Sequence, residues 1–260
     1  LAAAPEFFAR FDELLREQIR THPDDPQLQR VLSDIEATLL SEWGGEYADQ
    51  WAKYVKDLKG PWEEPPLPAI FETTFGRSSF DDTPQQHDSL VLGVAHREVR
   101  VGGRIDRIDV GRAGGRPAFV VVDYKTGSSA KHSAKQVKAG ERIQLPLYAM
   151  AVERLGLVAG DAVAMGLGYW CVKESGFKVM LDAATEDAGE LTASEAWQQL
   201  QEILEENVPK LAAGIRKGEV PVCNHDAKCT TNCEFSTVCR VGQIRALAEI
   251  KHNTLNLEHP

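Results

Sequence analysis

Residues 103–127 carry the pattern that most restricts how this chain can fold. Positions 103–109 have the composition of a strand, 111–116 are rich in turn residues, and 119–126 are β-branched and aromatic until Gly127. Two strand-like runs joined by a glycine-rich turn predict a β-hairpin. We therefore expect a fold built around a sheet with this hairpin in it.

The second strand of the predicted hairpin carries an acid and an amine on one face. Successive strand side chains point to opposite faces, so Asp123 and Lys125 share a face and Tyr124 lies on the other. If Asp106 pairs opposite this end, two carboxylates and an ammonium group converge. Mg²⁺ prefers oxygen ligands and often takes one or two carboxylates. A lysine beside such an ion can orient or deprotonate water, or neutralise charge in a transition state.

A helix is predicted to open directly after the hairpin, at residues 144–151. Gln144 and Tyr148 are four residues apart and therefore lie on one face of this helix. Both side chains can contact the backbone or a metal-bound water.

In chain order, the motifs G-x-I-D, D-Y-K-T-G and Q-L-x-L-Y resemble the PD-(D/E)xK nuclease core in its RecB/AddB-like branch. The resemblance implies an α/β, restriction-endonuclease-like fold: a mixed central sheet flanked by helices. It further implies Asp106, Asp123 and the Tyr124 carbonyl as ligands of Mg²⁺ or Mn²⁺, Lys125 as the catalytic lysine, and Gln144 and Tyr148 as the helix motif. The implied activity is that of a deoxyribonuclease.

The structural alternative is a solvated pair of Asp123 and Lys125 at a strand end, with Asp106 and Asp109 as turn residues. It explains neither the helix motif nor the order of the three motifs. For Asp109, just before the turn, we favour the structural role. Glu72, in an E-x-x-F-G segment ahead of the hairpin, is a second-rank candidate for the site because the family often has a glutamate there.

Four cysteines lie close together near the end of the sequence: Cys223, Cys229, Cys233 and Cys239. In a chain without secretory features such clustering indicates metal or cluster ligation rather than disulfides. The last three resemble the C-terminal motif of iron–sulfur AddB-like nucleases, which implies a [4Fe–4S] cluster. The first gap is three residues where two is usual, and Cys171, the one cysteine further upstream, has the pattern of a small core residue. The fourth ligand is therefore either Cys223 or a residue that precedes Leu1. A Cys₄ zinc site and an empty site remain alternatives.

The rest of the chain predicts three regions: a helical N-terminal region at 1–60, a nuclease core at 61–220 and a Cys-rich segment with a C-terminal helix at 221–260. Apolar spacing predicts helices at 6–20, from residue 28 onwards, around 46–58 and at 194–215, and strands at 70–76, 162–172 and 177–181. The aromatic stripe of 46–58 favours core packing over a base-stacking platform. The prolines at 61–68 predict a rigid linker.

The net charge of −10 argues against free-standing DNA binding, because nonspecific affinity comes mainly from basic residues. A DNA path therefore needs a local basic surface, and the arginines at 97, 100, 104, 107, 112 and 116 are the candidates, with a solvated hairpin face as the equal alternative. Relatives in this branch commonly have a metal-binding histidine in a G-x-x-x-H-x-x-L-E context. That context does not occur here.

From the resemblance we expect a nuclease that cleaves DNA, as single strands delivered by a helicase, in double-strand-break repair; exonuclease and endonuclease action both stay open. The rival is a catalytically inactive nuclease-fold module that binds DNA or serves as a scaffold. No apolar run approaches the roughly 20 residues that span a membrane and no signal peptide is evident, so we expect a cytoplasmic location. Leu1 is not an initiator methionine, so we expect the chain to be a piece of a longer protein.

Overall fold

The fold was analysed in a computed structural model. It describes residues 27–58, 60–76, 87–94, 98–127, 133–174, 176–187 and 190–219, with side chains from residue 38 onwards, and four separate helical positions between 10 and 17. The chain forms two compact units, 1–209 and 210–260. Most of the helix predicted at 6–20 and the whole segment 221–260 lie outside the described residues, and the predicted region boundaries remain predictions.

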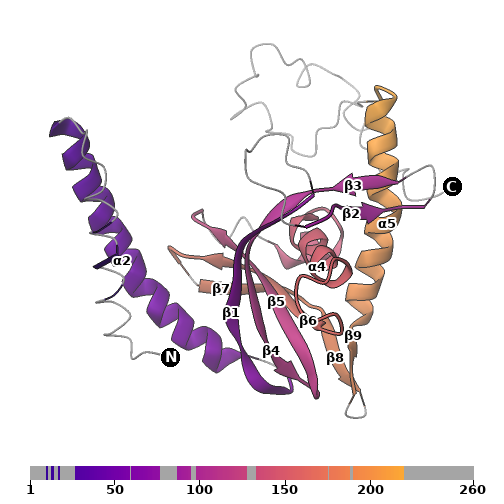
Figure 1. Ribbon diagram of the computed structural model, residues 1–260, viewed down its shortest axis with the longest axis horizontal. Coiled ribbons are helices and arrows are strands. Elements are labelled where there is room, and N and C mark those ends of the chain that lie inside the picture. The colour runs from indigo at the N-terminus through magenta and orange to yellow at the C-terminus, as the bar shows by residue number, and fades with distance from the viewer. Residues whose placement is uncertain are drawn as a thin grey trace. The chain divides into compact units, whose positions relative to one another are not determined.

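The first unit is built on a five-stranded sheet with the order β1-β4-β5-β6-β7 (Figure 1). The strands are β1 (Trp62–Phe75), β4 (Gly103–Ala113), β5 (Arg116–Lys125), β6 (Val163–Cys171) and β7 (Gly176–Asp182). All neighbours are antiparallel except β5 and β6, which are parallel. The predicted mixed sheet of a restriction-endonuclease-like α/β fold is thereby confirmed, with the β4–β5 hairpin in its interior.

The hairpin turn consists of two glycines. Gly114 and Gly115 have φ angles of 56° and 71°, the left-handed region that side chains with a Cβ rarely adopt. Two successive positive φ values suit the twist of a tight hairpin. The turn is thus shorter than the predicted 111–116, and both strands are longer.

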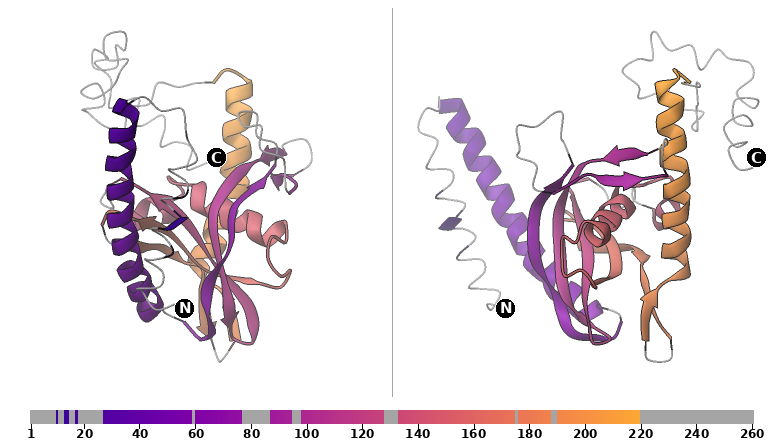
Figure 2. Two further views of the ribbon diagram at one scale, coloured as in Figure 1. Left: turned by 60° about the vertical axis from the view of Figure 1, so that its left-hand side comes forward. Right: turned by 45° about the vertical axis from the view of Figure 1, so that its right-hand side comes forward.

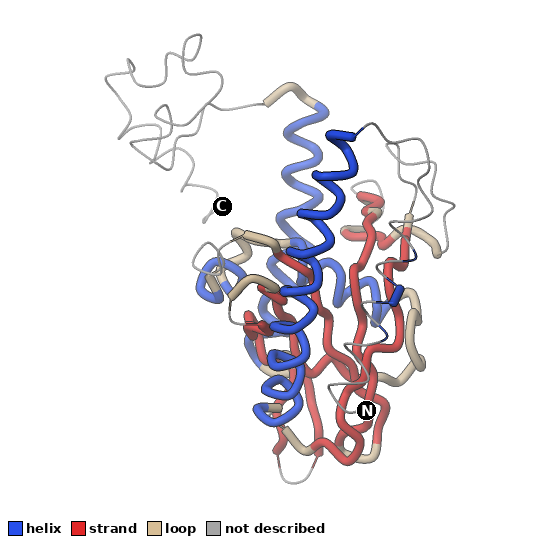
Figure 3. Tube along the Cα trace, turned by 90° about the vertical axis from the view of Figure 1, so that its left-hand side faces the viewer, coloured by secondary structure: helices blue, strands red, loops and turns tan. Residues whose placement is uncertain are grey.

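Helices cover both faces of the sheet (Figure 2). On one face, α4 (Gln144–Arg154) and α5 (Glu195–Arg216) bury Leu145, Met150, Trp197 and Leu200 against the main core, which confirms both predicted helices. The other face carries α2 (Gln27–Asp57), which stands in front of the strands when the fold is viewed from its side (Figure 3).

The α2 helix carries an aromatic stripe into the second core. Tyr47, Trp51 and Tyr54 pack with Val122 of β5 and Trp170 of β6, which confirms core packing as the role of the stripe. The two helices predicted from residue 28 and around 46–58 are one continuous helix. The Gly44–Gly45 pair does not interrupt it, because aromatic burial outweighs a helix cost of about 1 kcal/mol per glycine.

The proline-rich segment is not a linker, which corrects the prediction. Pro65, Pro66 and Pro68 belong to β1, at the edge of the sheet. An edge strand has N–H groups that face away from its neighbour, so it tolerates proline where a central strand does not. Register shifts occur between Trp62 and Glu64, between Glu64 and Leu67 and between Pro68 and Ile70, in the part of the strand that holds these prolines.

Five short elements complete the described part: β2 (Leu90–Leu92) paired with β3 (Val99–Val101), α3 (Ala134–Lys138), and the hairpin of β8 (Ala184–Asp187) and β9 (Glu190–Ala193). The acidic residues of 186–206 are typical of the outer face of a helix, but the first of them belong to the β8–β9 hairpin. None of the helices described has the length and apolar character needed to cross a membrane.

Candidate active site

Asp106 and Asp123 lie at the point where the two hairpin strands part. The pairing of β4 with β5 runs from the turn to Arg107 opposite Val122, and the next positions in this register are Asp106 and Asp123. Beyond that point β4 stays paired with β1, while β5 stays paired with β6. The predicted convergence of the two carboxylates follows from this register, since opposite residues of an antiparallel pair share a face.

Where β4 and β5 part, a backbone N–H of β5 is hydrogen-bonded to a side chain of β4. The Tyr124 N–H donates to Asp106 Oδ2 over 2.9 Å, a bond to a side chain in place of a ladder bond. The N–H and C=O of one strand residue point to the same side of the strand. The Tyr124 carbonyl is therefore on the Asp106 side of β5, where a further metal ligand is expected.

Among the predicted site residues that the structure describes, Asp123 is the most enclosed, with 2% of its side chain exposed. Its Oδ1 accepts a hydrogen bond from Gln144 Nε2 at 2.8 Å, and its Oδ2 contacts Lys125 Nζ. Burial raises the pKa of Asp123 above its ordinary value; Lys125 opposes this shift and Asp106 adds to it. The Asp123 anion thus lacks compensation that a bound cation would supply.

Lys125 reaches the site at the end of β5, with 27% of its side chain exposed. Besides its ion pair with Asp123, the ammonium group lies 5.3 Å from the centre of the Tyr169 ring, on β6. Sequence reasoning missed Tyr169. Strand periodicity could have found it, because Tyr169 is two residues from both Leu167 and Cys171 on the predicted strand at 162–172. The three side chains therefore share one face, and Leu167 and Cys171 are buried.

The helix motif meets the strands through Gln144. This amide donates to Asp123 and also to the Tyr148 hydroxyl at 3.1 Å, so the two predicted helix residues contact each other and the site. Gly103 explains the glycine of the first motif: a Cβ there would lie 2.9 Å from Tyr148 Cε1 and 3.1 Å from the Phe75 ring. A larger residue at this position would push the Tyr148 ring or the buried Phe75 ring away from the start of β4.

The donor set fits a hard divalent cation. Two carboxylates from adjacent strands and one backbone carbonyl are oxygen ligands of the kind that Mg²⁺ and Mn²⁺ take, with water and substrate oxygens completing the shell. Asp123 Oδ2 is buried, and among the described residues it has the Lys125 ion pair but no hydrogen-bond donor in regular geometry. The described residues contain no cluster of three His, Cys, Asp or Glu side chains placed for a metal. The protein would thus hold the ion with few side chains.

Glu72 was a second-rank candidate for the site, and Arg107 was one of the candidates for a basic DNA path. Glu72 follows Phe71, which pairs with Arg107, and has a left-handed φ of 48°; its carboxylate pairs with Arg104 at 3.0 Å in an exposed ion pair. Arg107 is fully buried and cannot line a DNA path. Its strand alternation places it on the face opposite Asp106.

The remaining arginines of the predicted path are distributed along the hairpin. Arg112 and Arg116 lie at its turn end, where they bond to backbone carbonyls of Gly115 and Asp161. Arg100 belongs to β3, and Arg97 lies outside the described residues. The described arginines therefore do not form one basic path along the hairpin.

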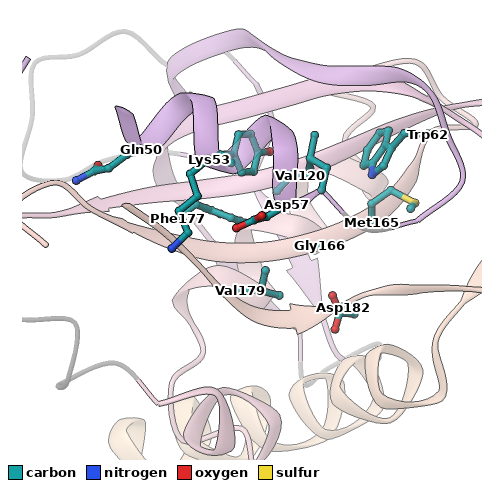
Figure 4. A pocket seen from close by; sticks show the side chains of 12 residues that line it. Gln50, Lys53, Asp57, Trp62, Val120, Met165, Gly166, Phe177, Val179 and Asp182 are labelled. Carbon is teal, nitrogen blue, oxygen red and sulfur yellow. The ribbon is translucent and has the colours of Figure 1, made fainter. Parts of the chain in front are cut away.

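A pocket of about 170 Å³ lies between α2 and the sheet (Figure 4). Lys53 and Asp57 from α2 and Phe177 and Asp182 from β7 line it. It opens on the α2 face, whereas Asp123 and Gln144 meet on the α4 face, so it is separate from the carboxylate site.

A mixed sheet whose central hairpin brings together two aspartates, a lysine and a helix glutamine is the arrangement of a PD-(D/E)XK nuclease core. A family model described as the PD-(D/E)XK nuclease superfamily matches residues 2–240, and the chain belongs to this superfamily. It is also similar to a subunit of the ATP-dependent helicase/deoxyribonuclease of Moorella thermoacetica, with 42% identity over 82 residues. The match covers 30% of this chain and 7% of that protein. Together these findings confirm the RecB/AddB-like resemblance.

Proposed function

We propose that this chain is a Mg²⁺-dependent deoxyribonuclease that hydrolyses DNA phosphodiesters. The observation that supports the proposal is the placement of Asp106 and Asp123 at opposing positions of adjacent strands, with Lys125 on one of the two carboxylates. Asp106, Asp123 and the Tyr124 carbonyl would hold Mg²⁺ or Mn²⁺. When bound, the ion supplies charge stabilisation for the phosphate and lowers the pKa of its water.

Each of the other site residues has a distinct role in this proposal. Lys125 faces the reacting phosphate, where its ammonium group orients the attacking water or neutralises the charge that builds on the phosphate oxygens. Gln144 fixes the rotamer of Asp123 through its hydrogen bond. Tyr148, held by Gln144, contributes a hydroxyl at the edge of the site.

The substrate we propose is single-stranded DNA delivered by a helicase, in double-strand-break repair. The support is the name of the Moorella thermoacetica relative, which combines helicase and deoxyribonuclease. The net charge of −10 agrees with delivery by a partner, because such a chain attracts DNA weakly by itself. The proposal includes a cytoplasmic location. It covers both exonuclease and endonuclease action.

We also propose that Cys223, Cys229, Cys233 and Cys239 hold a [4Fe–4S] cluster with a structural role, with Zn²⁺ as the alternative. The support is their spacing in the sequence, since they lie outside the described residues. Hydrolysis of a phosphodiester involves no electron transfer, so a cluster here would serve folding.

The experiment that tests the activity is a cleavage assay on end-labelled single-stranded and duplex DNA, with Mg²⁺, with Mn²⁺ and with chelator. Asp106→Ala and Asp123→Ala should abolish metal-dependent cleavage while the sheet stays folded, because removing one of two carboxylates also relieves their repulsion. Asp161→Ala, an exposed turn aspartate, is the matched control and should cleave normally. Undiminished cleavage by Asp123→Ala contradicts the proposal.

The same assay distinguishes the proposed nuclease from the rival function. An inactive DNA-binding or scaffold module binds DNA but shows no cleavage with either metal, and its carboxylate variants bind DNA as the unaltered chain does. The absence of the family's histidine context in the sequence favours this rival. The intact set of Asp106, Asp123, Lys125 and Gln144 favours the enzyme.

A further inference from the structure

A buried arginine lies directly behind the carboxylate site. Arg107 is fully enclosed on the α2 face of the sheet, next in sequence to Asp106, which is on the other face. Its Nε and Nη2 contact the two oxygens of Asp109 at 2.7 and 2.9 Å. Its Nη1 donates to the Tyr47 hydroxyl at 2.7 Å and to the Tyr124 hydroxyl at 2.6 Å. Burial lowers the pKa of Arg107, but Asp109, Tyr47 and Tyr124 together outweigh it and the net shift is upward, so the guanidinium is charged.

Aromatic rings enclose the same guanidinium. Its carbon is 4.5 Å from the centre of the Trp170 ring, 5.3 Å from that of Tyr124 and 5.5 Å from that of Trp51. Gln50 then ties α2 to β6, because it accepts from Trp170 Nε1 and donates to the Val172 carbonyl, both at 2.7 Å. The α2 helix thus closes the back of the site strands.

The energetics of the buried ion pair between Arg107 and Asp109 indicate that Arg107 positions its neighbours. Replacing a buried ion pair by apolar residues often leaves stability unchanged or higher, so the pair is poor evidence for stability as its purpose. What the Arg107 network does supply is geometry. Ladder pairing of β4 and β5 ends at Arg107 opposite Val122, one position before the two aspartates.

Tyr124 connects this network to the metal ligands. Its side chain accepts from Arg107 on one face of the sheet, while its backbone N–H donates to Asp106 Oδ2 at the other. We infer that Arg107 and Tyr124 form a cross-strand brace that positions Asp106 and Asp123 for metal binding, and that α2 locks this brace through Tyr47. Arg107 and Tyr124 act in it through side chains that touch neither metal nor substrate.

The brace has a clear physical task. Asp106 and Asp123 repel each other when both are ionised, and the hairpin has no further ladder bonds to hold its strands together at that point. The bond from Arg107 to Tyr124 holds the two strands at a fixed separation behind the carboxylates. Outer-shell contacts of this kind set how well ligands are oriented before a metal arrives.

The inference rests on the proposed metal site, and Mn²⁺ binding tests both without relying on cleavage. The affinity of Mn²⁺ alone is measured by calorimetry on the 260-residue chain, and thermal unfolding is measured in chelator. Tyr124→Phe keeps the ring and the backbone bond to Asp106 but removes the hydroxyl. We expect its Mn²⁺ binding to be weaker by about tenfold, the lower end of outer-shell effects.

Tyr54→Phe is the matched control. It removes another tyrosine hydroxyl from the same network, one that donates to Asp109 at 3.1 Å and has no bond to Tyr124. We expect it to lower the unfolding temperature as Tyr124→Phe does and to leave Mn²⁺ affinity unchanged. If Arg107 and Tyr124 form a brace, Mn²⁺ affinity falls in Tyr124→Phe but not in Tyr54→Phe. If the network only stabilises the fold, the two variants have equal Mn²⁺ affinity, and that result overturns the inference.

Two further outcomes are decisive. If Tyr124→Phe does not fold, Tyr47→Phe replaces it: weaker Mn²⁺ binding supports the brace, and unchanged binding overturns it. If the unaltered chain shows no Mn²⁺ binding that depends on Asp123, the proposed function fails, and the inference fails with it. The Asp123→Ala variant in the same titration distinguishes failure of the proposed metal site from failure of the brace alone.

Discussion

Gln144 Nε2 donates a hydrogen bond to Asp123 Oδ1 over 2.8 Å and so joins the first residue of α4 to the most buried carboxylate of the site. The contact bridges 21 residues of sequence. It holds Asp123 in one rotamer while the other oxygen is engaged by Lys125.

Gln144→Ala should therefore reduce cleavage without unfolding the chain. Loss of an outer-shell hydrogen bond to a metal ligand typically costs about 10–100-fold in metal affinity or activity. The measurement is the dependence of cleavage rate on Mg²⁺ concentration. Gln199→Ala is the control, because Gln199 also donates a helix amide to a carboxylate, that of Glu195, but on the exposed face of α5. Equal rates for both variants contradict the role given to Gln144.

Lys125→Met should separate chemistry from binding. Methionine keeps much of the apolar stem of the side chain but removes the amine, so turnover is expected to fall by orders of magnitude while Mn²⁺ and DNA affinity survive. Single-turnover cleavage and equilibrium DNA binding are measured side by side. Lys173→Met, which removes an exposed lysine that lies over the Trp43 ring, should leave both unchanged. Retained turnover in Lys125→Met contradicts the catalytic role and favours the scaffold.

Asp123→Asn should stabilise the metal-free protein at neutral pH. Burial raises the pKa of Asp123 above its ordinary value of 3.8, so the folded protein holds this proton more tightly than the unfolded chain. The ionised carboxylate consequently costs stability above the raised pKa. That cost shrinks as the pH falls and is gone below 3.8, where both states are protonated.

Thermal unfolding in chelator between about pH 4 and pH 8 checks this expectation. The gain of Asp123→Asn over the unaltered chain should be largest at the alkaline end and should decrease toward the acid end. With added Mg²⁺ the unaltered chain should become the more stable of the two, because the ion stabilises only the chain that binds it. Asp161→Asn serves as control. A variant that is less stable than the unaltered chain throughout disproves the expectation.

The cysteine cluster is tested by what the purified protein contains. Anaerobic purification should give visible absorbance from thiolate-to-iron charge transfer and about four iron atoms per chain if Cys223, Cys229, Cys233 and Cys239 hold a [4Fe–4S] cluster. Stoichiometric zinc without iron would establish the alternative. Cys171→Ala is the control, since this cysteine is buried in β6 and should not affect metal content. Four freely titrating thiols in native protein exclude both.

The shared face of Asp123 and Lys125 in the candidate site could be predicted from sequence, because strand alternation encodes it locally. Asp123 and Lys125 share the face of Val121, and the structure places Val121 in the α4-side core and Val122 in the α2-side core. The pairing of Asp106 opposite Asp123 could be stated only as a condition, because it depends on the register of the hairpin, and the observed turn at Gly114 and Gly115 is shorter than the predicted one. The helix motif was predictable, since its spacing is set within a single turn.

What could not be predicted depends on long-range packing. The prolines of β1 favour a linker by local propensity, and only the sheet edge, which forms at β4, makes them compatible with a strand. Likewise, nothing within residues 103–116 shows that Arg107 is buried. Its partner Tyr47 lies 60 residues away on α2. Alternation does separate Arg107 from Arg104, and this signal argues against one basic path.

The prolines of β1 also determine how the sheet ends. An exposed edge presents unpaired N–H and C=O groups that can recruit a strand from another molecule, and β1 exposes Leu67 and Phe71 beside such groups. Pro65, Pro66 and Pro68 offer no N–H there, and the register shifts near them interrupt the regular spacing that an incoming strand needs. The segment that breaks the expected pattern thereby protects the protein from edge-to-edge aggregation.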